Sequence, residues 1–289
     1  MPETPPREIL SILGLEVVSD FAGRLNKHWL VESSGERMVL RRWAPQPLAS
    51  IEYERRLVAS LAGMGFPVAT LGVPVEFEGT LWSVLPFLPG EPLPAGDPAE
   101  WRSRGRRLAE FHGATAQIEG LEQRPGWRRC EEILADHSLD RLLSENESRL
   151  PEEVRILRWH LDRARLRIEG LAIAPLPAIP NHGDFARWNL LFEDGRLTGL
   201  LDFELAHNDH RVEDFALAWR GKYDEVIEGY EEVSLLEPIE RALVVPAWWA
   251  SLIEMACGHL RQGNWDDGWI ISKLLARSPF MGADAVDLP

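Results

Sequence analysis

The segment between residues 182 and 202 holds side chains whose types and spacing could do chemistry. It starts as His182-Gly-Asp184-Phe-Ala-Arg-Trp-Asn189 and ends as Leu-Asp202-Phe-Glu. A carboxylate such as Asp184 can accept a hydrogen bond from a hydroxyl and orient it for attack. The oxygens of Asn189 and Asp202 are hard ligands, suited to magnesium ions that bridge phosphates. These three residues therefore predict phosphate chemistry directed at a hydroxyl.

Protein kinases have the same residue order. There, a catalytic Asp is followed by an Asn after four residues, and then by a metal-binding Asp in a D-F-G sequence. Each piece also has an ordinary explanation, because a lone H-x-D is frequent and an Asp after a strand often caps a turn. The three pieces together indicate kinase chemistry more specifically than any one of them does alone.

A hairpin is predicted between Asn189 and Asp202. One apolar run follows Asn189, the turn Glu193-Asp-Gly interrupts it, and a second run covers residues 197–201. Asp184 and Asn189 then lie on the loop that enters the hairpin, and Asp202 lies at its exit.

The N-terminal part supplies candidate partners for phosphates. Residues 15–43 predict three strands, and residues from 48 to about 62 predict a helix. Arg41 lies on the third strand, where a guanidinium could contact phosphates. Strand alternation alone does not decide whether Arg41 or Arg42 points inward. Gly23 and Asn26 lie in the turn between the first two strands, where a small residue would let backbone amides approach phosphate oxygens.

Glu54 is the predicted partner of Arg41. On the helix it shares a face with Leu57, Val58 and Leu61, at spacings of three, four and seven residues. An acid on an apolar face needs a cationic partner.

Two parts of the chain differ in pattern. Strands dominate before the break at residues 86–97, and helices are predicted after it, at roughly 97–119, 128–148 and 151–169. We therefore predict an α+β fold with an N-terminal lobe of residues 1–88 and a mainly helical lobe of residues 89–289.

With these residues in hand, the sequence resembles the aminoglycoside phosphotransferase and choline kinase family. His182-Gly-Asp-Phe-x-x-x-Asn-Leu-Leu-Phe is similar to the family's HGDxxxxN loop, and Leu-Asp202-Phe-Glu to its I-D-F segment. Val39-Leu-Arg-Arg resembles the family's third strand. This alignment favours Arg41 over Arg42 as the phosphate-binding residue, although the family usually has Lys at that position. Two further segments also resemble motifs of this family: Leu108-Ala-Glu-Phe-His112 and Asp214-Phe-Ala.

The resemblance implies a two-lobed protein-kinase-like fold, ATP or GTP as donor, and magnesium as cofactor. It implies Asp184 as base and Asn189 and Asp202 as metal ligands. The segment from Leu85 to Phe87 resembles the linker after the adenine-binding strand. Supporting roles are expected for three further residues: His182, Arg187 and Glu204. Arg187 could stabilise transferred charge or seal its loop through an ion pair, and the latter is favoured.

Two other functions stay open. Arg41 and the altered loop at residues 186–188 could leave a nucleotide-binding module without catalysis. A metal-dependent phosphohydrolase could instead gather imidazole and carboxylate ligands, which would be His182, Asp184, His207, Asp209 and His210. That alternative leaves Asn189 and the N-terminal strands without a role.

The acceptor is expected to be a small molecule with a hydroxyl group, such as an aminoglycoside or other antibiotic, choline, homoserine or an amino sugar. C-terminal acids would suit a polycation, though a solvated surface explains most of them better. They are Asp209, Asp214, Asp224, Glu225, Glu228 and Glu231. Trp219, Trp248 and Trp249 could cage a quaternary ammonium, but core packing is the safer interpretation.

The composition of the chain narrows the kinds of binding partner and site that remain possible. A net charge of −15 disfavours binding to nucleic acid or anionic membranes. The two cysteines, Cys130 and Cys257, form no zinc or dithiol motif. The apolar stretch 242–257 contains Pro246 and Glu254, which favours a buried helix over a membrane span. We expect a cytoplasmic monomer or homodimer.

Overall fold

The computed structural model describes residues 4–21, 26–265 and 268–285. Contacts between residues divide the chain into two compact units. The first unit consists of Met1–Leu93, Gly120–Pro125 and Trp188–Asp202. The second consists of Pro94–Glu119, Gly126–Arg187 and Phe203–Pro289.

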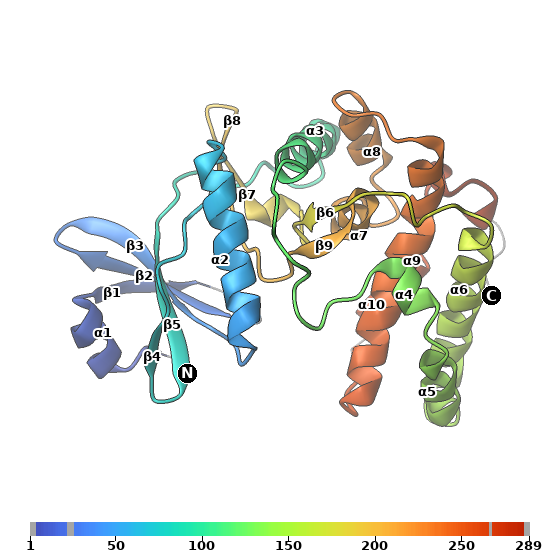
Figure 1. The fold of residues 1–289 in the computed structure, drawn as a ribbon, viewed down its shortest axis with the longest axis horizontal. Helices are drawn as coiled ribbons and strands as arrows, with labels where there is room; N and C mark the ends of the chain where they lie inside the picture. The colour runs from blue at the N-terminus through green and yellow to red at the C-terminus, as the bar shows by residue number, and fades with distance from the viewer. Residues whose placement is uncertain (1–3, 22–25, 266–267, 286–289) are drawn as a thin grey trace. The chain divides into compact units, whose positions relative to one another are not determined.

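The first unit contains a five-stranded antiparallel sheet with the order β1-β2-β3-β5-β4 (Figure 1). Its strands are β1 (Glu16–Phe21), β2 (Lys27–Ser33), β3 (Glu36–Arg42), β4 (Val75–Phe77) and β5 (Thr80–Pro86). Strands β1, β2 and β3 correspond to the three strands that the sequence predicts for residues 15–43. The short strand β4 was not predicted; it pairs with β5 across a turn at Glu78 and Gly79, both of which have positive φ.

Two helices cover opposite faces of this sheet. Helix α1 (Arg7–Leu13), which was not predicted, places Ile9 in a core cluster with Leu40 of β3 and Trp82 of β5. The next residue of β3, Arg41, contacts Glu54 of helix α2 (Leu48–Gly63). Since consecutive strand residues point to opposite faces, α1 and α2 lie on different sides. This alternation places Arg41, and not Arg42, on the face of α2.

The hairpin of β7 (Leu190–Glu193) and β8 (Arg196–Leu200) belongs to the first unit. The backbone N–H of Glu91 donates to the carbonyl oxygen of Phe192 over 3.1 Å, and Leu200 N–H donates to Pro67 over 2.8 Å. The sequence predicted a single boundary after residue 88. In the structure, segments of the two units instead alternate along the chain, because this hairpin pairs with backbone more than 90 residues earlier in the sequence.

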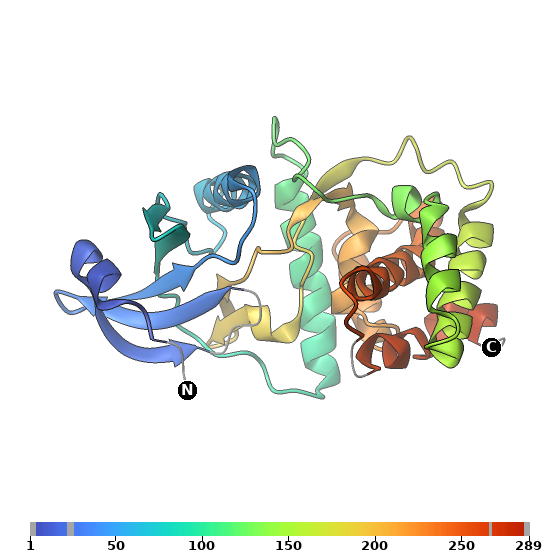
Figure 2. The same cartoon turned by 90° about the horizontal axis from the view of Figure 1, so that it is seen from below.

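The second unit is mainly helical, with one two-stranded sheet of β6 (Ala178–Asn181) and β9 (His207–His210). Its helices are α3 (Pro98–Thr115), α4 (Cys130–Leu134), α5 (Ser138–Asn146), α6 (Pro151–Ile168), α7 (Phe215–Ala218), α8 (Asp224–Glu231), α9 (Pro238–Arg261) and α10 (Trp269–Leu274). Short 3-10 segments are η2 (Arg211–Asp214) and η3 (Pro279–Ala285), the latter kinked at Gly282, and η1 (Arg187–Asn189) lies where the chain passes into the first unit. Helix α3 runs unbroken in Figure 2.

The single helix predicted for residues 128–148 is two helices in the structure. Helix α4 ends at Leu134, and Asp136 then accepts a hydrogen bond from the backbone N–H of Ser138 at the start of α5. An Asp side chain that bonds the backbone two residues on favours a turn over continued helix. The predicted α+β class is confirmed.

Helix α9 contains the apolar stretch singled out in the sequence. Its length and composition alone would allow it to cross a membrane, but 72% of its apolar window is buried inside the second unit. It packs against α6, and side chains such as Trp249 and Ile253 have no exposed surface. The structure therefore supports a core helix.

Candidate active site

The expected partners Arg41 and Glu54 form a buried ion pair in the first unit. Arg41 Nη1 lies 2.5 Å from Glu54 Oε1, and Nη2 lies 3.4 Å from Oε2. The guanidinium also lies over the ring of Trp43, 3.8 Å from its centroid. Burial, together with the charge of Arg41, lowers the pKa of His28 on the neighbouring strand to about 4. His28 is therefore neutral at pH 7, and the positive charge here belongs to Arg41.

The predicted nucleotide loop is described only at its end. Gly23 lies outside the described residues. Asn26 is buried, and its Oδ1 accepts a hydrogen bond from the backbone N–H of Ala44 over 2.8 Å. This bond ties the residue before β2 to the segment between β3 and α2. Asn26 therefore has a structural contact, and its predicted role toward phosphate stays a prediction.

The predicted linker residues lie where β5 ends. Leu85 is opposite Val39 of β3 in the sheet, and Phe87 is the first residue after the strand. Both side chains are half-buried. Their contact with an adenine or guanine base stays a prediction.

The hairpin β7–β8 brings the backbones of the two predicted metal ligands together. Leu190 is opposite Leu200, and Leu201 N–H donates to the carbonyl oxygen of Asn189 over 2.9 Å. Asn189 and Asp202 therefore flank one end of the hairpin. Asp202 has a φ of 64°, in the left-handed region that non-glycine residues adopt at a cost. One amide oxygen and one carboxylate at this end form a donor set that fits magnesium.

The loop that carries Asp184 lies in the second unit and is held by Asp214. Asp214 Oδ2 accepts a hydrogen bond from the backbone N–H of His182 over 2.8 Å, and Oδ1 accepts one from Gly183 over 2.7 Å. Gly183 has a φ of 79°, and a Cβ there would lie 2.3 Å from the carbonyl oxygen of Leu205. Only glycine fits this close approach. Asp184 itself is half-buried.

Asp214 keeps its charge although it is fully buried. Burial acts to raise its pKa, but hydrogen bonds and the charges of neighbouring groups, chiefly His112, lower it below the ordinary value. His112 Nε2 lies 3.0 Å from Asp214 Oδ2, and its Nδ1 lies 2.9 Å from the hydroxyl of Tyr230. His112 was noted in the sequence only as a supporting motif piece, and Asp214 as such a piece and as one of the C-terminal acids. The structure identifies them as the residues that position the loop.

The three supporting residues have different surroundings. His182 is fully buried, packs on Phe111 and Phe203, and accepts a hydrogen bond from Asp184 N–H at Nδ1 over 3.2 Å. Arg187 is half-buried, with Glu100 and Arg104 as electrostatic neighbours. Glu204 is half-buried in the turn before β9. His182 thus serves to shape the loop.

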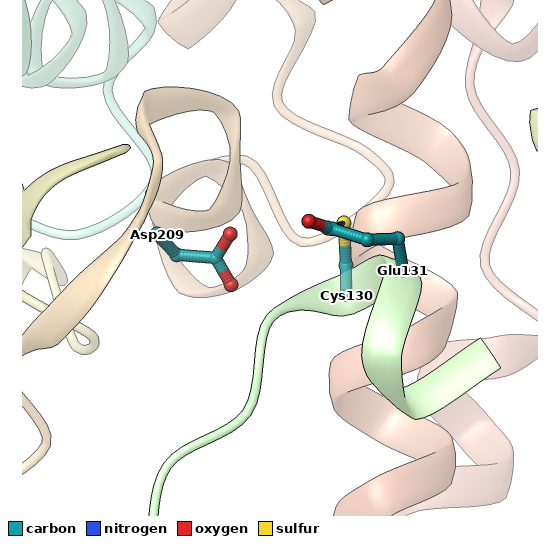
Figure 3. Close-up of side chains that lie close together, drawn as sticks. All are labelled: Cys130, Glu131 and Asp209. Carbon is teal, nitrogen blue, oxygen red and sulfur yellow. Dashed lines mark hydrogen bonds between the residues drawn. The ribbon is translucent and has the colours of Figure 1, made fainter. Parts of the chain in front are cut away.

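The residues of the alternative hydrolase site lie partly together in the second unit, where His207 Nε2 is 4.0 Å from Asp209 Oδ2. The ring of His207 stacks on Trp127 with centroids 4.3 Å apart, while that of His182 packs on Phe203. Asp209 instead lies with Cys130 and Glu131, and the ligand atoms of these three are within 4.8 Å of one another (Figure 3).

This second cluster is a buried network that can share protons. Glu131 lies 3.3 Å from His210 Nε2 and accepts from the Cys130 thiol over 3.5 Å. Asp209 Oδ1 accepts from the backbone N–H of His210 over 2.6 Å. Burial raises the pKa of Asp209 to about 7, and that of Cys130 well above its usual range. Asp209 can therefore take up a proton near neutral pH, while the Cys130 thiol stays neutral.

Comparisons with known proteins identify the family and the fold of the chain. A model of the phosphotransferase enzyme family (APH) matches residues 18–243. A solved thermostable mutant of aminoglycoside phosphotransferase APH(4)-Ia, in ternary complex with ADP and hygromycin B, is 16% identical and has a TM-score of 0.69, covering 93% of this chain and 95% of that chain.

Two further solved structures share the fold. An aminoglycoside phosphotransferase from Alicyclobacillus acidocaldarius is 16% identical, with a TM-score of 0.64 and coverage of 95% of this chain and 91% of that chain. Spectinomycin phosphotransferase APH(9)-Ia, in complex with ADP and spectinomycin, is 13% identical, with a TM-score of 0.61 and coverage of 95% and 93%. The predicted kinase-like fold is confirmed. Since the family model spans most of the chain, including Asp184, Asn189 and Asp202, the chain belongs to the phosphotransferase enzyme family and is a small-molecule kinase.

Proposed function

We propose that this enzyme transfers the γ-phosphate of ATP or GTP to a hydroxyl group of a small molecule, with magnesium as cofactor. The observation that carries the proposal is the hairpin β7–β8. It is entered through the loop of Asp184 and Asn189 and left at Asp202, in the residue order of kinases. Membership in the phosphotransferase family and the buried pair of Arg41 and Glu54 support it.

In the proposed transfer, the acceptor oxygen forms a bond to the γ-phosphorus. The bond from that phosphorus to the oxygen bridging the β-phosphate breaks, and its electron pair leaves with the nucleoside diphosphate. The hydroxyl proton passes to Asp184 and from there to solvent. Asp184 thus orients the hydroxyl and removes its proton, while Asp214 and His182 hold the loop.

Asn189 and Asp202 are the residues proposed to hold magnesium. The ion supplies positive charge against the phosphate oxygens. Arg41, kept in place by Glu54, adds a guanidinium that can pair with two phosphate oxygens. Gly23 and Asn26 are proposed to border the phosphates, and Leu85 and Phe87 the base.

The proposed setting is the reducing cytoplasm, with the enzyme as a monomer or homodimer that binds no nucleic acid or membrane. Both cysteines are buried and free, so no disulfide is needed. The strong negative charge repels nucleic acid and anionic lipid.

The proposal is tested by nucleotide-dependent thermal stabilisation. ATP, GTP and a non-hydrolysable ATP analogue are each added with and without magnesium. A nucleotide at about 100 times its Kd should raise the Tm by roughly 5–10 °C, because a ligand that binds only the folded state stabilises it. Magnesium should be needed for the full effect.

The matched variants are Asp202→Asn and Asp194→Asn. Both aspartates flank β8 and have positive φ, 64° and 48°, which Asn tolerates as well as Asp. Asp202→Asn should lose the magnesium-dependent part of the stabilisation, and Asp194→Asn should keep it. No stabilisation of the unaltered enzyme by any nucleotide would refute the proposal. Stabilisation without nucleotide consumption, across a broad set of acceptors, would favour the binding module instead.

A further inference from the structure

Three side chains of the second unit converge on one point, and none of them has a role in the proposed transfer. Cys130 and Glu131 are the first two residues of helix α4, and Asp209 lies on strand β9. Figure 3 shows their terminal atoms pointing toward one another. The thiol sulfur and one oxygen of each carboxylate all lie within 4.8 Å of one another. A thiol and two carboxylates, brought together from distant segments, form a donor set for a cation.

The carboxylate of Asp209 is only partly satisfied. Its side chain is 1% exposed, and Oδ1 accepts a hydrogen bond from the backbone N–H of His210 over 2.6 Å. Oδ2 is buried and has no hydrogen-bond donor among the described residues. His207 Nε2 lies 4.0 Å from it, too far for a hydrogen bond. A buried carboxylate oxygen without a donor is costly, and a bound cation or a proton removes that cost.

The sulfur of Cys130 determines which kind of cation fits. Magnesium and calcium take oxygen ligands, whereas a thiolate favours zinc and similar transition metals. Zinc bonds of about 2.0–2.3 Å at tetrahedral angles place neighbouring ligand atoms about 3.5 Å apart. Cys130 Sγ and Glu131 Oε2 already have that separation, 3.5 Å. Asp209 would need to approach the other two by roughly 1 Å.

The surroundings of Glu131 suit a bound zinc ion. His210 Nε2 lies 3.3 Å from the Glu131 carboxylate and can hold the oxygen that faces away from the ion. The thiolate and the two carboxylates carry three negative charges, which zinc and a protonated His210 balance. The side chain of Glu131 is 29% exposed, whereas Cys130 is buried. Glu131 therefore offers the ion a route from solvent and leaves room for a water molecule as fourth ligand.

We propose that Cys130, Glu131 and Asp209 bind a divalent cation of the zinc type, which ties helix α4 to strand β9. The site goes beyond the proposed transfer and does not depend on it. Because zinc ligands bind without their protons, the thiol proton and any proton on Asp209 would pass to solvent as the ion binds. Asp209 would then titrate near neutral pH only in zinc-free enzyme.

The role of the ion is structural. Strand β9 pairs with β6, where Asp209 is opposite Ile179, and β6 ends one residue before His182 of the proposed catalytic loop. A zinc ion that holds β9 to α4 thereby steadies the strand pair that leads into this loop. Since such an ion binds the folded state, it should raise the thermal stability of the enzyme.

Cobalt(II) is the probe for the first experiment, because zinc has a filled d shell and no useful absorption. Chelator-treated enzyme, as the full chain, is titrated with cobalt. We expect a thiolate-to-cobalt charge-transfer band in the near ultraviolet that saturates at one ion per chain and disappears when zinc is added. An excess of magnesium should leave the band unchanged. Cobalt binding without this band would overturn the inference, because the thiol would then not be a ligand.

The matched variants alter the two buried cysteines of the chain. Cys130→Ser should lose the charge-transfer band, and Cys257→Ser, on helix α9, should keep it. Asp202→Asn should also keep the band, which separates this site from the proposed magnesium site. A band that persists in Cys130→Ser would refute the assignment of the ligands.

A further variant changes the partly exposed ligand, where the substitution should not disturb folding. Glu131→Gln should weaken zinc binding at least roughly 100-fold, since even the outer partners of a metal ligand contribute 10- to 100-fold. The control is Glu145→Gln, at an exposed site on α5, which should leave zinc binding unchanged. Equal zinc affinity of Glu131→Gln and the unaltered enzyme would contradict the proposal.

Thermal unfolding tests whether the group binds a metal or only a proton. Zinc at about 100 times its Kd should raise the Tm of chelator-treated enzyme by roughly 5–10 °C. At the same zinc concentration, the Tm of Glu131→Gln should stay close to its zinc-free value. No change of Tm with zinc, together with no cobalt band, would mean that the group holds a proton only and would refute the site.

Discussion

Asp184 contributes to the proposed transfer through the negative charge of its carboxylate. Asp184→Asn keeps the size of the side chain but removes the base, so kcat should fall by roughly two to four orders of magnitude. Thermal stabilisation by nucleotide and magnesium should persist. The control is Asp162→Asn, at an exposed site on α6, which should leave turnover unchanged. Near-normal turnover of Asp184→Asn would remove it from the mechanism.

Residue order predicted only part of the site. Asp184, Asn189 and Asp202 were identifiable because a short segment with a hairpin contains all three. The pair of Arg41 and Glu54 was predicted from helix periodicity, which placed an acid on an apolar face. The contact of His112 with Asp214 joins residues 102 positions apart, and no local pattern encodes it.

At the scale of elements, the contact of α3 with α8 depends on glycines. A Cβ at Gly105 would lie 1.9 Å from the carbonyl oxygen of Val226 in α8. Gly105→Ala should therefore lower the free energy of unfolding by about 1–3 kcal/mol, through forced separation of the helices. Gly113→Ala, on the same helix with open space around it, should instead raise it by up to ~1 kcal/mol. Urea unfolding of both variants measures the difference. Equal effects of the two would contradict this packing.

The buried acids around β9 predict a pH dependence of stability. Asp209 has a pKa of about 7 in the folded enzyme, because burial disfavours its charge, whereas an ordinary Asp has 3.8. Burial also raises the pKa of Glu213, and His210 has a raised pKa through Glu131 despite its own burial. At these residues the folded state holds more protons than the unfolded chain between pH 5 and 7, so their contribution to stability falls as pH rises, by at most ~1.4 kcal/mol per pH unit for each proton retained. His28 and His160 contribute a slope of opposite sign below about pH 6.5, because burial lowers the pKa of each to about 4.

Asp209→Asn should flatten that slope, because its amide does not titrate. The lowered pKa of Glu131 acts in the other direction, but only below about 4.5, outside the range tested. Urea unfolding at intervals from pH 5 to 8 measures the effect. The same pH dependence of stability in Asp209→Asn and in the unaltered enzyme would contradict the assignment.

Sequence patterns predicted long elements better than short ones. The meander, α2, α3, α6 and the hairpin β7–β8 follow clear periodicities, and the structure contains them. Helix α1 and strands β4, β6 and β9 have at most seven residues each, too few to establish a period. The break between α4 and α5 depends on the side chain of Asp136, which bonds the backbone of Ser138.

At the scale of the whole molecule, the sequence predicted the α+β class and the change from strands to helices. It could not predict that the hairpin at residues 190–200 would join the first unit, because backbone pairing with Glu91 and Pro67 connects distant segments. This arrangement divides the proposed residues: Asn189 and Asp202 belong to the first unit, and Asp184 to the second.

Mass spectrometry of the acceptor, after incubation with enzyme, ATP and magnesium, tests the central claim most directly. The claim is transfer of a phosphoryl group to a hydroxyl by Asp184. One phosphoryl group should be added to the acceptor per nucleoside diphosphate formed, and the product should be nearly absent with Asp184→Asn. Release of free phosphate with no modified acceptor, at the same rate in Asp184→Asn, would contradict the claim.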